Sequence, residues 1–334
     1  MRFSISIALF LVMQLLASTA IAQPDDCIGR VYATGNFQET AFQETAFQET
    51  EKEMQEESSK EKISQEKIKA GANFKTENLV AWCIVPFDAN NRGPAERAKM
   101  VRRLGLKRVA YDWRSKHIPE FEEEILQYKA NDIEYFAFWD WHDSMEALIK
   151  KHEITPQIWN MPTLPKKLAD KSDAEKTKAV AEQLLPVVEK AKSLGLKFGI
   201  YNHGGWAGEP KNLIAVCEYL RTKHDATNVG IVYNFHHGHA DIDGFEAAFK
   251  QLKPYLLCLN LNGMADPETV DPKTQANKIV AIGLGLHEQK MIQVVVDSGY
   301  DGPIGVLGHR KEMDAEKSVG ENVEGLKGLV EIVN

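Results

Sequence analysis

Two stretches of the chain decide its fold: Lys197–Trp206, which reads KFGIYNHGGW, and Gly230–Asp241, which reads GIVYNFHHGHAD. Each begins as a short apolar run typical of a buried strand and ends abruptly in Asn, His and Gly. In α/β barrels the loops that follow the strands build the active site, so polar groups collect at the strand ends. We therefore expect the ends of both strands to face one mouth of a barrel.

Strand and helix candidates alternate from Glu77 to the C-terminus. The expected strands are Leu79–Val85, Arg108–Tyr111, Tyr135–Trp139, Pro156–Trp159, Lys197–Tyr201, Val229–Tyr233, Tyr255–Leu261 and Ile304–Leu307. The expected helices are Gly93–Leu104, Ile118–Lys129, Ser144–Lys151, Asp173–Ser193, Pro210–Lys223, Phe245–Leu252, Glu288–Ser298 and Lys317–Ile332. This rhythm over about 260 residues predicts a (β/α)8 TIM barrel, a single domain over residues 77–334. A dinucleotide-binding sheet is disfavoured because no GxGxxG turn follows the first strand.

The residues before the barrel divide into two segments. Residues 1–22 have the pattern of a signal peptide: Arg2, an apolar run at Ile5–Leu16 and the small-residue site Ala20-Ile21-Ala22. We expect an exported protein, periplasmic or secreted, without a membrane anchor after cleavage, since no later run approaches about 20 apolar residues. Residues 23–76 contain three FQET repeats followed by a charged stretch, which predicts a disordered or loosely helical extension.

Charge and cysteine usage exclude several classes of protein. The net charge is −8 and lysines are scattered among glutamates, so no basic stripe for nucleic acid is present. Cys83, Cys217 and Cys258 fall in apolar stretches, where we expect small buried thiols. Their spacing supports neither a thiolate metal site nor a disulfide scaffold.

The strand ends supply the candidate site. The candidate catalytic residues are His203, His237 and His309, and the candidate substrate-binding residues are Asn202, Asn234, Asn260, Asp112, Trp141 and Trp206. Aromatic rings stack on sugar faces, while sugar hydroxyls need both donors and acceptors, so this set suits a small carbohydrate. For each tryptophan the alternative is packing at the barrel rim. His237 is preferred to His236 because neighbouring side chains of a strand point to opposite faces.

The order of these motifs resembles the sugar phosphate isomerase/epimerase superfamily, with a xylose isomerase-like TIM barrel. The resemblance rests on NHGG at 202–205, N-x-x-H at 234–237, LCLNLNG at 257–263, IGLGLH at 282–287 and SGYDGPIGV at 298–306. It covers roughly Leu79–Val333. It implies a divalent cation held by carboxylates and a histidine, and isomerisation or epimerisation of a sugar through an enediolate or a hydride shift.

The chain departs from that pattern at the ligand positions. The positions of the family's cation ligands are here Tyr201, Asn234, Asn260 and Leu307. Neutral amides alone hold a hard cation weakly, because carboxylates offset the cost of its dehydration. Three interpretations stay open. A cation (manganese, zinc or magnesium) is held by another set, such as His203, His237 and His309 with Asp112 or Asp140; or no metal is used and a histidine is the base; or the site only binds.

These observations favour an enzyme of the isomerase or epimerase type that acts on a sugar or keto-sugar by proton transfer next to a carbonyl. His203 and His237 are then the acid and base, the three asparagines orient oxygens, and His309 is a closing electrophile or ligand. The same enolisation followed by β-elimination gives the first alternative, a lyase acting on a 3-keto-glycoside. The second is a carbohydrate-binding pseudoenzyme. The sequence leaves the substrate and the oligomeric state open.

Overall fold

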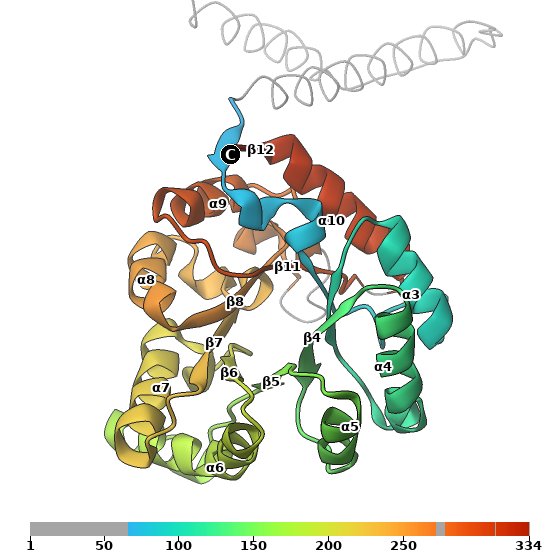
Figure 1. Ribbon diagram of the computed structural model, residues 1–334. Helices are drawn as coiled ribbons and strands as arrows, with labels where there is room; N and C mark the ends of the chain where they lie inside the picture. Colours follow the sequence, from blue (N-terminus) through green and yellow to red (C-terminus); the bar gives the residue numbers. More distant parts are fainter. Residues whose placement is uncertain (1–65, 272–277, 311, 334) are drawn as a thin grey trace, which may run out of the picture. The chain divides into compact units, whose positions relative to one another are not determined.

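The computed structural model describes residues 66–271, 278–310 and 312–333, which contain a closed barrel of parallel strands surrounded by helices (Figure 1). In order around the barrel the strands are β11 (Ile304–Leu307), β2 (Val80–Trp82), β3 (Arg108–Tyr111), β4 (Glu134–Trp139), β5 (Gln157–Asn160), β6 (Phe198–Tyr201), β7 (Val229–Asn234) and β8 (Leu256–Leu261). All of their pairings are parallel, from β11 and β2 round to β8 and β11. The predicted TIM barrel is confirmed.

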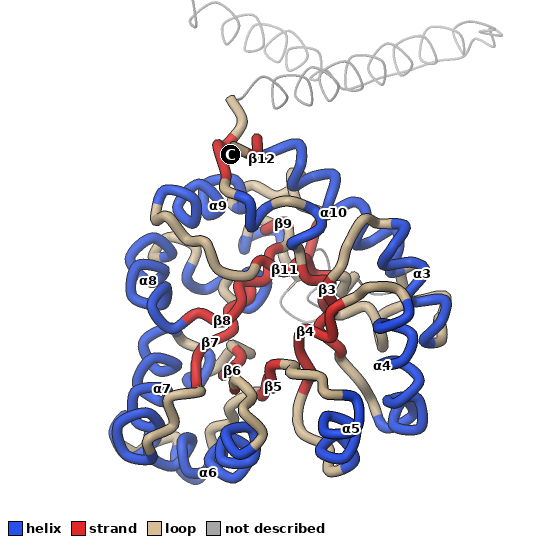
Figure 2. The backbone as a smooth tube through the Cα atoms, viewed as in Figure 1, coloured by secondary structure: helices blue, strands red, loops and turns tan. Residues whose placement is uncertain are grey.

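The helices lie outside the strands (Figure 2). They are α3 (Pro94–Arg103), α4 (Phe121–Ala130), α5 (Ser144–His152), α6 (Asp173–Ser193), α7 (Pro210–His224), α8 (Phe245–Leu252), α9 (Glu288–Asp297) and α10 (Ala315–Leu329). Local sequence fixes several of their first turns. Ser172 and Glu175 form a capping box at the start of α6, and proline occupies the first position of α3 and of α7, where its missing N–H costs nothing.

The two ends of the described chain differ from expectation. The helix expected at Lys317–Ile332 ends at Leu329, and Val330–Ile332 forms strand β12. It pairs in parallel with β1 (Ile68–Ala70), a strand within residues that we assigned to the N-terminal extension. Both elements bury apolar side chains that would otherwise face water, which explains the difference. The signal peptide and the FQET repeats lie outside the described residues.

The apolar side chains form two layers. The larger layer lies between the strands and the helices, and the smaller fills the barrel lumen with Val80, Trp82, Trp159, Tyr201 and Leu307 among others. Bulky rings there need small partners on the adjacent strands. A Cβ atom at Gly199 would lie 2.9 Å from Cδ1 of Trp159 and 2.6 Å from Cγ2 of Val232, so only glycine fits beside that indole.

Two further expectations can be compared with the described residues. Cys83, Cys217 and Cys258 are free and buried, as predicted. None of the helices described is long and apolar enough to cross a membrane. Two short strands were not predicted: β9 (Gly263–Met264) and β10 (Ile279–Val280), which pair antiparallel after β8.

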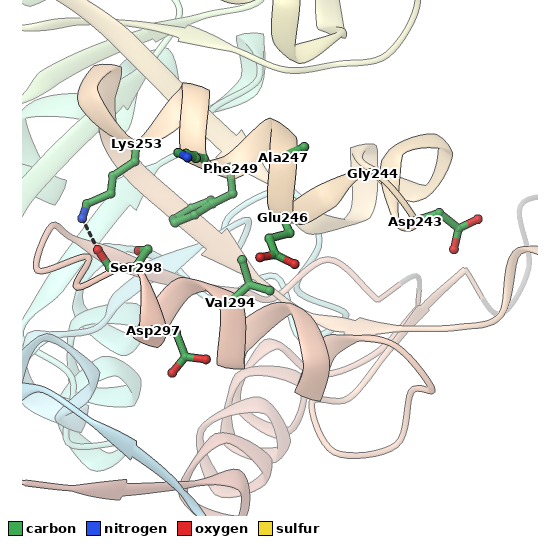
Figure 3. A pocket seen from close by; sticks show the side chains of 10 residues that line it. Asp243, Gly244, Glu246, Ala247, Phe249, Lys253, Val294, Asp297 and Ser298 are labelled. Atoms are coloured by element: carbon green, nitrogen blue, oxygen red, sulfur yellow. Dashed lines mark hydrogen bonds between the residues drawn. The ribbon is translucent and has the colours of Figure 1, made fainter.

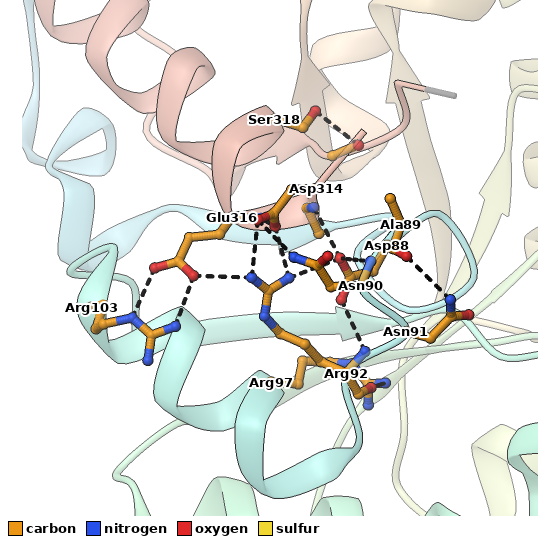
Figure 4. A network of polar contacts seen from close by, with 12 residues as sticks. Asp88, Ala89, Asn90, Asn91, Arg92, Arg97, Arg103, Asp314, Glu316 and Ser318 are labelled. Atoms are coloured by element: carbon orange, nitrogen blue, oxygen red, sulfur yellow. Dashed lines mark hydrogen bonds and ion pairs between the residues drawn. The ribbon is translucent and has the colours of Figure 1, made fainter. Parts of the chain in front are cut away.

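A polar network joins the first and last loops at the strand ends (Figure 4). Asp88, buried in the loop after β2, accepts a hydrogen bond from the amide of Ala315 at the start of α10 (3.1 Å). Arg92 Nη1 lies 2.8 Å from Asp88 Oδ1 and 2.7 Å from Asp314 Oδ1, and Arg92 also pairs with Glu316. Charge-assisted bonds of this kind hold the loop after β2 against α10, at the seam where the barrel closes.

A fully buried ion pair joins two neighbouring helices. The Arg97 guanidinium on α3 donates to the Glu124 carboxylate on α4, and their side chains are only 1% and 0% exposed. An ion pair at this depth adds little net stability, but losing one partner leaves the other charge unpaired.

Replacing Arg97 with methionine is therefore expected to lower the free energy of unfolding by about 3–5 kcal/mol. Urea denaturation followed by circular dichroism measures the change. Arg102→Met, at an exposed position of the same helix, is the matched control and should shift stability by less than about 0.5 kcal/mol. The double variant Arg97→Met/Glu124→Leu should recover most of the loss; a double variant no more stable than the single one would contradict this account.

Candidate functional site

Four histidines meet at the C-terminal ends of β6, β7 and β11. The ring of His203, after β6, lies 4.4 Å from that of His237, measured between centroids. His237 and His236 are 3.6 Å apart, and His236 is 6.2 Å from His309, which follows β11. We call His203, His236, His237 and His309 the histidine cluster. The three predicted catalytic residues are thus close together.

His236 joins the cluster although strand alternation disfavoured it. Strand β7 ends at Asn234, and the chain turns at once into the 3-10 turn η6 (Phe235–His237). In such a turn neighbouring side chains no longer alternate between opposite faces, so His236 and His237 lie side by side. His236 is 6% exposed, and its Nδ1 has no hydrogen-bond partner.

Burial favours the neutral form of each histidine in the cluster. Burial, followed by the effects of His203 and Lys278, lowers the pKa of His237 to about 2. Burial and the nearby Arg114 lower the pKa of His309 to about 4. Desolvation also lowers the pKa of His203, the most exposed of the four, and that of His236. Each neutral imidazole offers one donor and one acceptor nitrogen, as a sugar-binding or proton-transfer site needs.

Lys278 is a site residue that the sequence reasoning missed. It immediately precedes β10 and is half-buried, which lowers the pKa of its ammonium. Strand β10 pairs with β9, which contacts the turn that carries His236 and His237, and the charge of Lys278 lowers the pKa of His203, His236 and His237. No local pattern marks it, because β10 is only two residues long and its position depends on pairing with β9.

The asparagines at the strand ends bind mainly to one another. Asn202 Oδ1 accepts hydrogen bonds from the backbone amide (2.7 Å) and Nδ2 (2.9 Å) of Asn234. Asn202 Nδ2 donates to the carbonyl oxygen of Asn234 (3.1 Å), and Asn260 is the register partner of Asn234 on β8. Two buried atoms remain without a partner: Asn234 Oδ1 and Asn260 Nδ2. The predicted asparagines are therefore together, with one acceptor and one donor free.

Asp112 is a buried carboxyl at the end of β3. Its Oδ1 accepts from the amide of Val85 (3.3 Å), while Oδ2 is buried without a partner. Burial raises the pKa of Asp112 to about 7, opposed in part by Arg114. The Arg114 guanidinium lies over the ring of Phe87 (5.6 Å), which stacks on His309 at 3.6 Å. Arg114 therefore connects this carboxyl with the histidine cluster.

The two tryptophans predicted to bind substrate are engaged elsewhere. Trp206 Nε1 donates to Asp173 Oδ1 at the start of α6 (2.8 Å), and Lys176 lies over its ring. Trp141 Nε1 donates to Asp143 Oδ1 (3.1 Å). Neither indole stacks on a member of the histidine cluster in the described ring contacts. These contacts favour the alternative interpretation, packing at the barrel rim.

The positions of the family's cation ligands do not fit a cation in this chain. The Tyr201 ring is buried and its hydroxyl accepts from Trp82 Nε1 (3.0 Å), and Leu307 is buried and apolar. Asn234 and Asn260 contribute only neutral amides, which cannot replace the missing carboxylates. In the described part of the chain no three His, Cys, Asp or Glu side chains are grouped so as to hold a metal ion; this covers the set of His203, His237 and His309 with Asp112 or Asp140.

A groove on the outer side of the barrel lies between α8 and α9 (Figure 3). Phe249 and Val294 form its apolar part, and Glu246, Asp297 and Lys253 its polar part. All of the groove's lining residues lie on or beside these two helices. None of the predicted site residues belongs to it.

The comparison with protein families agrees with the barrel and its strand-end site. The family described as "Xylose isomerase-like TIM barrel" matches residues 140–329, more than half of the chain. The chain belongs to this family. No curated protein sequence matches the chain.

Solved structures with the same fold are distant in sequence. The probable 3-DHS dehydratase AsbF from Bacillus anthracis is 13% identical, with a TM-score of 0.56 over 75% of this chain and 98% of that one. The 3-keto-D-glucoside 4-epimerase YcjR from E. coli is 13% identical, with a TM-score of 0.54 over 76% of this chain and 99% of that one. D-psicose 3-epimerase from Clostridium cellulolyticum is 12% identical, with a TM-score of 0.51 over 75% of this chain and 99% of that one. At these identities the likeness concerns the fold.

The raised pKa of Asp112 predicts a pH-dependent stability. Between about pH 4, where the carboxyl titrates in the unfolded chain, and pH 7 the folded protein binds the extra proton, so stability falls as pH rises through this window. The free energy of unfolding of Asp112→Asn should be close to that of the wild type at pH 4. At pH 8 it should be higher than that of the wild type by up to about 4 kcal/mol. Urea titrations across this range measure the effect.

The control for this prediction is Asp243→Asn, at an exposed position before α8. It should keep the wild-type pH profile. An Asp112→Asn variant whose stability follows the wild-type curve at every pH would contradict the assignment.

Proposed function

We propose that this protein is an enzyme of the isomerase or epimerase type that acts on a sugar or keto-sugar by proton transfer at a carbon next to a carbonyl. The observation that carries the proposal is the histidine cluster: neutral imidazoles from β6, β7 and β11 at the C-terminal mouth of the barrel. In barrels of this class that mouth is where catalytic groups collect. The substrate is a small carbohydrate, with no role for nucleic acid.

In the proposed step His203 removes the proton and His237 donates a hydrogen bond to the oxygen that becomes negative. A pKa near 2 makes His237 a weak base in the free protein and a good hydrogen-bond donor toward a developing enolate oxygen. His203 is more exposed and less affected by neighbouring charges, so it is better suited to remove the proton. Asp112, which titrates near neutral pH, is a second group able to exchange a proton under working conditions.

The unpartnered amide atoms suit the same chemistry. Asn234 Oδ1 and Asn260 Nδ2 are buried without partners, and a bound hydroxyl or carbonyl oxygen would satisfy them. Because the family's cation positions hold a tyrosine, a leucine and two amides, the proposed steps use only the protein's own side chains. His309, stacked on Phe87, would close the opposite side of the site.

Two structural neighbours are named as sugar epimerases and one as a probable dehydratase. The epimerase names support sugar chemistry for this fold. The dehydratase name supports the runner-up, a lyase that uses the same proton removal followed by β-elimination, on a 3-keto-glycoside. We also propose export to the periplasm or beyond, on the signal-peptide pattern of residues 1–22.

Deuterium exchange tests the proposal without knowledge of the product. In D2O the protein should incorporate deuterium next to the carbonyl of at least one member of a panel of ketoses and 3-keto-glycosides, detected by NMR. His237→Ala should slow this exchange by about 10²–10⁴-fold, because the hydrogen bond to the enolate oxygen is lost, while ligand binding by calorimetry persists.

The matched control is His224→Ala, at the C-terminal end of α7, which should exchange at the wild-type rate. Retention of exchange in His237→Ala would refute the proposed role of the cluster. Binding without exchange by the wild-type protein, across the whole panel, would favour a carbohydrate-binding protein instead.

A further inference from the structure

We propose that the mouth selects a sugar that carries a carboxylate, and that the ammonium group of Lys278 pairs with that carboxylate. The inference uses the proposed function only to place the sugar at the histidine cluster. The substrate would then carry one negative charge, which Lys278 recognises.

The pairing of two short strands places Lys278 at the mouth. Strand β8 ends at Leu261 and leads into β9, which packs against η6, the turn that carries His236 and His237. Strand β10 pairs with β9, with Ile279 opposite Met264. Lys278 is the residue before Ile279 and is half-buried, so the pairing brings it to the side of the mouth where η6 lies.

Within the described residues no acid pairs with Lys278. It has no hydrogen bond or ion pair within the described residues, although it is half-buried. Among the described residues, Lys278 and Arg114 are the Lys and Arg side chains with the largest effects on the pKa values of the histidine cluster. A desolvated ammonium without a partner is costly, and a bound anion would remove that cost.

Buried polar atoms at the mouth point to an oxygen-rich group. His236 Nδ1 is buried without a partner, and Asn260 Nδ2 is a buried donor without one. The charge of Lys278 also lowers the pKa of His239. The Nδ1 atom of His239 lies 3.2 Å from the carbonyl oxygen of His236. An anion with two oxygens next to sugar hydroxyls would satisfy such a set.

The balance of charge favours a carboxylate over a phosphate. One ammonium among neutral imidazoles matches a single negative charge, whereas a phosphate monoester carries between one and two at neutral pH. The second cation, Arg114, donates to the carbonyl oxygen of Trp113 and lies over Phe87, and its charge acts on the buried Asp112.

A matched pair of ligands tests the inference. 2-Keto-D-gluconate and D-fructose share every centre except C1, which is a carboxylate in the first and a CH2OH group in the second. Calorimetry on the full chain, at constant ionic strength, should show 2-keto-D-gluconate binding more tightly than D-fructose. Lys278→Met should weaken the binding of the acid by about 10–100-fold and leave that of D-fructose unchanged.

Lys250→Met, at an exposed position of α8, is the matched control and should bind both ligands as the wild type does. Circular dichroism confirms that each variant is folded, and Lys278→Arg, which keeps the charge, provides a second variant that should retain part of the preference.

Equal affinity for the two ligands, no binding of the acid, or no effect of Lys278→Met would overturn the inference. Inorganic phosphate that displaces 2-keto-D-gluconate at lower concentration than acetate does would assign the site to phosphate instead. The proposed function is tested separately. Binding of the acid that depends on Lys278, without deuterium exchange, would refute the enzymatic function and support the carboxylate site. Deuterium exchange on neutral ketoses alone would support the enzymatic function and refute the carboxylate site.

Discussion

The need to fill the barrel lumen governs the rest of this structure. Trp82, Trp159 and Tyr201 occupy it, with the Trp82 indole donating to the Tyr201 hydroxyl at 3.0 Å. Gly199, on the strand next to β5, makes room for one of these rings, since any side chain there would collide with Trp159. Tyr201 also stands at a position where the family resemblance implies a cation ligand, so the proposed chemistry lies with the groups just beyond the strand ends.

Those groups form a site of unusual charge. Burial favours neutral histidines, Lys278 and Arg114 lower their pKa values further, and burial raises the pKa of the Asp112 carboxyl to about 7. In such surroundings negative charge that develops on a substrate oxygen is stabilised by donors already in place, without the reorganisation that water would require. The same surroundings disfavour a positively charged ligand.

Much of the fold could be predicted from the sequence, because each barrel strand is a short apolar run bounded by polar groups. Strands β1 and β12 could not, since each is only three residues long and they pair across almost the whole described chain. In the site, the proximity of His203, His237 and His309 followed from strand order. His236 was excluded by an alternation rule that ceases to apply where β7 ends, and Lys278 carries no local signal because a long-range hairpin positions it.

The central claim is that the mouth works with its own side chains and does not hold a cation at the family's ligand positions. Crystals soaked in manganese chloride, with diffraction recorded at the manganese absorption edge, test it most directly. The account predicts no anomalous peak within bonding distance of Tyr201, Asn234, Asn260 and Leu307. A well-occupied peak coordinated by the two asparagines, or by His203 and His237, would contradict it and return the chain to metal-assisted chemistry.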